Sequence, residues 1–140
     1  MEWTPVLKPE TSTAKTSAMQ IERSVVQGSA VVVKIEGRFE FSTRHEYKRL
    51  IGQIVQEGHR RLVLDLEGVT FLDSSALGLL LLTDQNLKLK NGNFSLVKPT
   101  GYVRQVLELA NLPRVIPVYD SMDEAIAGPV AKIPLRSSIG

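Results

Sequence analysis

An apolar approach ends in three small polar residues at the start of a helix in the stretch Val69-Thr70-Phe71-Leu72-Asp73-Ser74-Ser75-Ala76-Leu77-Gly78. Side-chain oxygens at such a position accept hydrogen bonds from the free N–H groups of the first helical turn. The helix then runs to about Asn91-Gly92 with apolar residues on several of its sides. We therefore expect this helix to be well buried.

Outward from this stretch, the spacing of apolar residues alternates between that of strands and that of helices. Thr43 and Glu46 fit a capping box before one helix, and Ser121 and Glu124 fit a second box before the last helix. Pro117 cannot donate a ladder hydrogen bond, so its strand is expected at a sheet edge. The expected strands cover 21–26, 30–35, 62–66, 94–97 and 115–119, and the remaining helices span about 44–57, 102–111 and 121–127.

This order, β-β-α-β-α-β-α-β-α, predicts a single small α/β domain. Gln27-Gly28-Ser29 separates the first two strands as in a hairpin, so the sheet is expected to be mixed. The order of the strands does not follow from these patterns. Residues 1–18 and 128–140 are rich in polar residues or interrupted by prolines and are expected to be flexible tails on a domain at 19–127.

Charge and composition exclude several classes of protein. The chain has 140 residues and a net charge of +2, and residues 19–127 hold 13 basic and 13 acidic side chains. A domain without surplus positive charge is not expected to bind nucleic acid. No stretch approaches the ~20 apolar residues of a membrane span, and the start of the chain lacks the pattern of a signal peptide. A cytoplasmic protein is the expectation.

The sequence offers little that could support catalysis. It contains no cysteine, and His45 and His59 lack the spacing of metal ligands. There is no G-x-S-x-G elbow to activate a serine, and no glycine-rich nucleotide-binding loop. We therefore expect neither an enzyme nor a bound cofactor or metal.

The segment from Asp65 to Gly78 closely resembles the signature of STAS domains, in particular that of anti-sigma-factor antagonists. The resemblance extends over about residues 19–127 and includes Gly37-Arg38-Phe39-Glu40 after the second strand. There the family usually has Gly, Glu, Leu and Asp, so Arg38 and Phe39 depart from its pattern. The resemblance implies a regulatory binding module of the STAS fold.

The resemblance also implies a switch. In the family, the serine that corresponds to Ser74 is phosphorylated by an anti-sigma factor that is itself a serine kinase. The unphosphorylated antagonist binds this kinase, the phosphorylated form is released, and a PP2C-type phosphatase resets it. On physical grounds, phosphate adds ~1.5 to 2 negative charges, which beside Asp73 would oppose docking without unfolding the helix. The free domain is expected to be a monomer.

Four further residues receive expected roles around Ser74. Asp73 and Glu40 are expected to support partner contact, Ser75 to cap the helix, and Gly78 to allow close packing or the approach of a partner. Asp65, midway along a strand, is expected to point outward as a polar residue rather than to belong to a site.

Two other functions remain open. The chain could be an accessory STAS subunit of an ABC-type lipid transporter, which docks on the ATPase without phosphorylation. It could also switch partners in a pathway whose output is not a sigma factor. The intact Asp73-Ser74-Ser75 favours the phosphorylated switch over the transporter subunit, because the second function does not need a spare hydroxyl.

Overall fold

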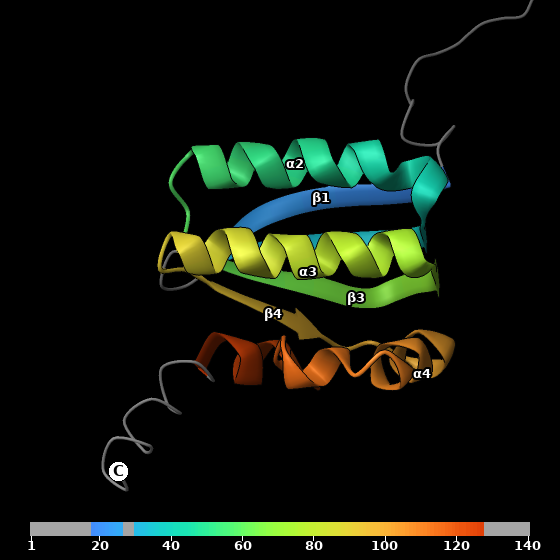
Figure 1. Ribbon diagram of the computed structural model, residues 1–140. Coiled ribbons are helices and arrows are strands. Elements are labelled where there is room, and N and C mark those ends of the chain that lie inside the picture. The colour runs from blue at the N-terminus through green and yellow to red at the C-terminus, as the bar shows by residue number, and fades with distance from the viewer. Residues whose placement is uncertain (1–17, 27–29, 128–140) are drawn as a thin grey trace, which may run out of the picture.

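The computed structural model describes residues 18–26 and 30–127. The predicted turn at 27–29 and the predicted tails, apart from Ala18, lie outside these residues. Five strands form one sheet, and helices α2, α3 and α4 lie side by side across one of its faces (Figure 1). The elements are β1 (Met19–Val26), β2 (Ala30–Phe39), the 3-10 helix η2 (Phe41–Thr43), α2 (Arg44–Gln56), β3 (Arg61–Leu72), α3 (Ser74–Leu89), β4 (Asn93–Val97), α4 (Gly101–Leu109), the 3-10 helix η3 (Leu112–Arg114) and β5 (Val118–Tyr119), followed by a helix over 122–127.

The sheet is mixed, as predicted. β1 pairs antiparallel with β2, whereas β2, β3, β4 and β5 are mutually parallel. Its order is β1-β2-β3-β4-β5, so every strand lies beside its neighbours in the chain. Parallel crossovers are right-handed, and three successive crossovers in one direction therefore place all three helices on the same face. β5 is an edge strand, which confirms the position predicted from Pro117.

The main core fills the space between the sheet and these helices. Alternate residues of β2 and β3 point into it because side chains of a strand alternate between its two faces. Tyr47 and Ile54 of α2 and Leu80 of α3 pack against them and are almost fully buried. The strand residues concerned are Val31, Val33, Ile35, Leu62, Leu64 and Leu66.

The opposite face of the sheet carries a smaller core under the helix at 122–127. Val32, Val63 and Val97 pack there against Ala125, which is fully buried. The second predicted capping box is confirmed in one half: Glu124 N–H donates to Ser121 Oγ at 3.2 Å, whereas the Glu124 carboxylate accepts the N–H of Asp120 instead of that of Ser121. This helix therefore starts where the sequence places it.

The first predicted capping box is wrong. α2 starts at Arg44, and the Thr43 hydroxyl makes no capping bond to this helix. Instead, Thr43 Oγ1 accepts the N–H of Glu40 at 3.0 Å and lies 2.9 Å from the carbonyl oxygen of Arg38. The hydroxyl closes the preceding turn, η2, because that turn brings two backbone groups within its reach.

Two predictions about burial are also wrong. Asp65 does not point into solvent: it is 7% exposed, its Oδ1 accepts the N–H of Glu67, and its Oδ2 lies 3.8 Å from Lys98 Nζ. α3 is only half covered, with Leu82 49% and Leu89 83% exposed. Its apolar residues extend beyond the side that faces the sheet, so some of them remain on the surface.

The strand boundaries differ from the predicted ones at functionally important places. β3 continues to Leu72 because its last residues pair with the end of β2 beyond two irregularities in register. The last strand is shorter than predicted, since the N–H groups of Val115 and Ile116 donate back to the carbonyl oxygen of Leu112 in η3 and only Val118 and Tyr119 pair with β4. Within 18–26 and 30–127, no helix is long and apolar enough to cross a membrane.

Candidate functional site

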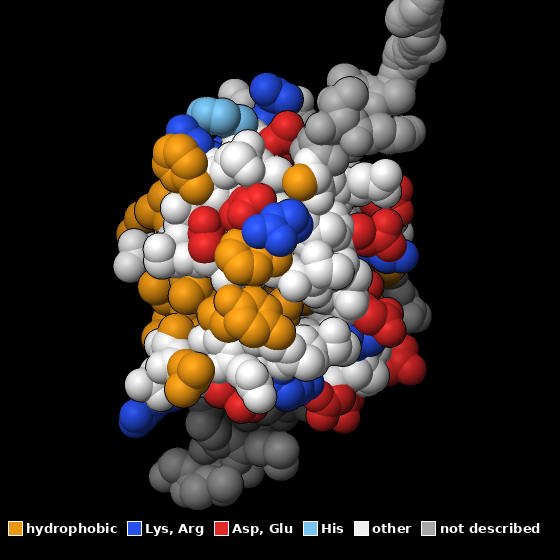
Figure 2. Space-filling model, turned by 90° about the vertical axis from the view of Figure 1, so that its right-hand side faces the viewer, with side chains coloured by type: hydrophobic (Ala, Val, Ile, Leu, Met, Phe, Trp, Pro, Cys, Tyr) orange, Lys and Arg blue, Asp and Glu red, His pale blue; other side chains and the backbone are white. Residues whose placement is uncertain are grey.

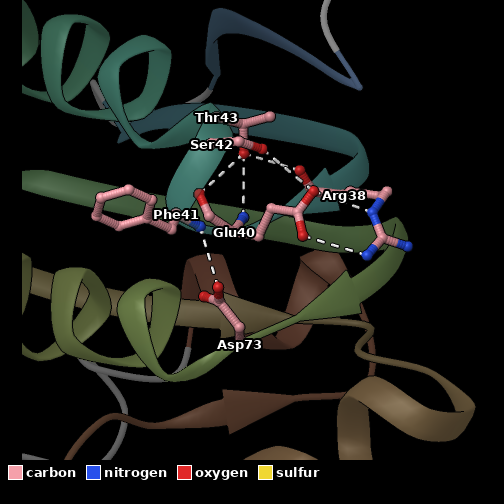
Figure 3. A network of polar contacts seen from close by, with 6 residues as sticks. All are labelled: Arg38, Glu40, Phe41, Ser42, Thr43 and Asp73. Atoms are coloured by element: carbon pink, nitrogen blue, oxygen red, sulfur yellow. Dashed lines mark hydrogen bonds and ion pairs between the residues drawn. The ribbon is translucent and has the colours of Figure 1, made fainter.

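The candidate site lies at the end of the sheet where β2 and β3 finish. These parallel strands are paired to their last residues, with Phe39 opposite Leu72. The loop after β2 and the start of α3 are therefore held side by side. Phe41, which directly follows Glu40, and Asp73 are distant in the sequence and are joined by a hydrogen bond at this end (Figure 3).

The carboxylate of Asp73 connects the two segments. Its Oδ1 accepts the N–H of Ala76 at 2.9 Å and so caps α3, while its Oδ2 accepts the N–H of Phe41 at 3.0 Å. Asp73 is thus the N-cap, and the prediction that Ser75 has this role is wrong. The reason is position: Asp73 has extended backbone, whereas Ser75 already lies inside the first helical turn.

Ser74 is the first residue of α3 and is exposed to solvent, while Ser75 is half-buried. Within the described part of the chain, neither hydroxyl makes a hydrogen bond. Because Asp73 supplies the cap, the structure of the helix end does not require the Ser74 hydroxyl. The first N–H groups of a helix have no intrahelical acceptor and attract anions, so this position suits a phosphorylated side chain.

Glu40 belongs to a network in the loop after β2. Arg38 donates two hydrogen bonds to its carboxylate, from Nε at 3.0 Å and from a terminal nitrogen at 3.2 Å, and Ser42 Oγ lies 3.3 Å from it. The hydrogen bonds with Glu40 are the main cause of a raised pKa of Arg38, and the charges of Glu40 and Asp73 add to it. This surface ion pair adds to the bonds from Thr43 and Asp73 that fix the same loop.

An aromatic cluster beside these residues was not anticipated from the sequence. The Phe71 ring stacks on Tyr102 with centroids 6.0 Å apart, and the Arg38 guanidinium lies 4.1 Å from the Phe71 centroid. Tyr102 is 51% and Phe41 58% exposed. Hydrophobic side chains gather in the middle of this face of the molecule (Figure 2). The sequence offers one hint of this cluster: Phe71, one of few aromatic residues in the chain, directly precedes the last residue of the strand.

Gly78 lies one turn along the exposed side of α3. A Cβ built there would meet no atom within 4 Å, so this glycine does not serve packing within the described part of the chain. The predicted close packing is thus wrong for the isolated domain. The expectation of a close approach by a partner stays a prediction.

The described residues contain no group of three potential ligands placed to hold a metal ion. His45 is exposed, and His59 lies 3.4 Å from a carboxylate oxygen of Glu57. Of the candidates from the sequence, Glu40, Asp73, Ser74 and Ser75 thus come together, with Gly78 one helical turn away. The arrangement presents an exposed hydroxyl on a rigid support, flanked by charged and aromatic side chains that another protein could contact.

Comparison with known proteins agrees with this arrangement. The family model described as STAS domain matches residues 21–125. A STAS-domain containing protein of Pseudomonas aeruginosa is 32% identical over 91 residues, which cover 65% of this chain and 89% of that protein. An anti-sigma F factor antagonist of Paenibacillus polymyxa is 25% identical over 109 residues, covering 77% of this chain and 92% of that protein.

Among solved structures, an anti-sigma factor antagonist from Mycobacterium paratuberculosis superposes with a TM-score of 0.71 at 27% identity, covering 78% of this chain and 92% of that one. The family model spans well over half of the sequence, from within β1 to within the last helix. The chain belongs to the STAS domain family.

Proposed function

We propose that this protein is an anti-sigma factor antagonist that binds an anti-sigma factor with serine kinase activity through the surface around Ser74. Phosphorylation of Ser74 releases the partner, and a PP2C-type phosphatase restores the binding form. The names of relatives support the antagonist function. The observation that carries the switch is the division of roles at the start of α3: Asp73 caps the helix and leaves the Ser74 hydroxyl exposed.

The chemistry of the switch follows from the surroundings of Ser74. A phosphate there adds ~1.5 to 2 negative charges beside the carboxylate of Asp73. The helix end tolerates these charges because its free N–H groups face the anion. A partner that must cover the same surface meets like charge and desolvation, and each 1.4 kcal/mol of penalty lowers affinity about tenfold. The phosphorylated protein is therefore expected to stay folded and to lose its partner.

Two surfaces beside Ser74 are available to a partner, the loop with Glu40 and the aromatic cluster. The loop with Glu40 provides fixed negative charge, partly balanced by Arg38. The cluster of Phe71 and Tyr102 provides apolar area. Aromatic residues dominate the binding energy of many protein interfaces, so these two rings are expected to contribute to affinity. Arg38 is expected to contribute to the choice of partner.

Binding measurements on variants of Ser74 test the proposal. The partner is first isolated from the host by its association with Ser74→Ala, which is expected to bind constitutively, and its affinity is then measured by calorimetry. Ser74→Asp should bind at least about tenfold more weakly, with an unchanged melting temperature. Ser24→Asp, at an exposed serine of β1, is the matched control and should bind like the wild type.

Peptide mass spectrometry on protein purified from the host gives an independent test. We expect phosphate on Ser74 in part of the population. Unchanged affinity of Ser74→Asp would disprove release by charge. A complete lack of phosphate under several growth conditions, together with copurification of a transporter ATPase instead of a kinase, would favour the accessory-subunit function.

A further inference from the structure

A surface groove runs between α2 and α3, away from the Ser74 site. It has a volume of about 810 Å³. Its apolar lining comes from one side of each helix, and two of its leucines are strongly exposed, Leu82 at 49% and Leu89 at 83%. The apolar lining residues are Ile51, Val55, Leu79, Leu82 and Leu89. Neighbouring exposed apolar residues beside a groove are suited to be covered by another segment.

The polar lining of the groove has a definite character. Two amide side chains, Gln56 and Asn86, lie along it, and the charged residues that line it are Lys48 and Lys90. No carboxylate is among its lining residues. An exposed glycine, Gly52, lies in the wall formed by α2, and a Cβ there would meet no atom within 4 Å. The groove is thus open enough for a bulky side chain and favours an occupant with acidic groups.

The position of the described amino-terminal end brings one candidate occupant within reach. The carbonyl oxygen of Ala18 accepts the N–H of Arg38 at 2.9 Å, so the chain enters the described fold at the end of β2 from which η2 and α2 start. Seventeen residues precede Ala18. Extended, they span up to about 55 Å, whereas α2 is only about 20 Å long. This segment can reach the groove and follow it.

The other terminal segment is less well placed. It follows the helix at 122–127, whose Ala125 packs with Val32, Val63 and Val97 on the opposite face of the sheet. A segment that starts there has to pass around the sheet before it meets α2 or α3. Geometry therefore favours the amino-terminal segment.

Composition also favours it. The apolar residues of the segment are concentrated near its start, where Trp3 is followed by Val6 and Leu7; Glu2 precedes them, and Lys8 and Glu10 follow them. A tryptophan buries about 150 to 250 Å² when it docks. The carboxylates can meet Lys48 and Lys90. We propose that residues 3–7 bind in the groove between α2 and α3 of their own chain, with Trp3 as the anchor.

This proposal is independent of the switch at Ser74, and the chain carries its own probe for it. Trp3 is the one tryptophan in the sequence, so its fluorescence reports on this segment alone. In the full-length protein we expect blue-shifted emission and a several-fold lower quenching constant with iodide than in a synthetic peptide of residues 1–17. Leu82→Glu should shift both values to those of the peptide.

A matched variant controls for the added charge. Leu109, at the end of α4, is 85% exposed and lies outside the groove, so Leu109→Glu should leave the emission and quenching of Trp3 unchanged. Circular dichroism confirms that both variants are folded. Ser74→Ala should also leave the fluorescence unchanged, which separates this result from the proposed switch.

Three outcomes would overturn the proposal. Emission of the wild type equal to that of the free peptide would mean that Trp3 is not bound. Shielding that persists in Leu82→Glu would place Trp3 elsewhere. Shielding that disappears on dilution would show that the groove binds a second copy of the chain instead of its own segment.

Discussion

Replacement of Asp73 by alanine is expected to loosen the end of the sheet that carries Ser74. Its carboxylate makes two hydrogen bonds, to the N–H of Ala76 at 2.9 Å and to that of Phe41 at 3.0 Å. Loss of a helix cap costs about 1 kcal/mol, and loss of a second hydrogen bond to a charged acceptor about as much at this partly exposed position. Asp73→Ala should therefore lower the free energy of unfolding by about 2 kcal/mol.

Asp73→Asn separates the two bonds. An amide has one acceptor oxygen, which can retain the cap at Ala76, but its NH₂ group cannot accept the N–H of Phe41. We expect this variant to lower the free energy of unfolding by about 1 kcal/mol, half the decrease in the alanine variant. Glu108→Ala removes an acidic side chain from an exposed position of α4 and should change stability by less than about 0.5 kcal/mol.

Urea denaturation followed by circular dichroism measures all three variants against the wild type. For a domain of this size, 2 kcal/mol corresponds to a decrease of roughly 8 °C in melting temperature. If Asp73→Ala lost no more stability than Glu108→Ala, the two hydrogen bonds of Asp73 would not stabilise the domain. If Asp73→Asn lost as much as Asp73→Ala, the two bonds would not act separately.

Three further variants test other parts of the structure. Burial raises the pKa of Tyr47, so the folded state keeps this phenol protonated where the unfolded chain ionises. The free energy of unfolding of the wild type should therefore fall by up to about 1.4 kcal/mol per pH unit above pH ~10. Denaturation at several pH values should show that Tyr47→Phe lacks this part of the fall. Gly78→Ala should raise the free energy of unfolding by about 0.5–1 kcal/mol, and with it the denaturation midpoint, because the position is helical and open. If stability did not increase, the helix would be strained there. Gly37→Ala should destabilise by more than about 2 kcal/mol, since its φ is +96° and a Cβ would lie 2.3 Å from the carbonyl oxygen of Ala18. Gly58 also has a positive φ, +94°, but a Cβ there would lie in open space. A loss of stability in Gly58→Ala equal to that in Gly37→Ala would therefore contradict the clash at Gly37.

Much of the fold could be predicted from the sequence because the spacing of apolar residues depends on local geometry. The hairpin and the alternation of strands and helices follow from this spacing, and the structure confirms them. The strand order could not be predicted in this way, because it depends on contacts between elements rather than within them. Similarly, the apolar residues of α3 suggested full burial, but none of the described elements covers the side with Leu82 and Leu89.

The candidate site was predictable in its members but not in its bonds. Asp73, Ser74 and Ser75 were singled out as a group, yet which of them caps α3 depends on the backbone conformation of Asp73. The bond from Phe41 to Asp73 joins residues 32 positions apart and has no local signal in the sequence. Asp65 was misplaced for a related reason. Its carboxylate is shielded by Lys98, which follows the neighbouring strand.

The order of the strands has a consequence for how the protein is made. Because each strand pairs with the one synthesised just before it, the sheet can grow at one edge as the chain leaves the ribosome. The parallel pairs still join residues far apart in the chain, such as Val31 and Leu62, so each of these steps is slower than the closing of a hairpin. The rear of the sheet is an exception, since Val32, Val63 and Val97 wait for Ala125, almost at the end of the described chain. A nascent chain stopped after β5 would hold a paired sheet whose rear valines are still in water.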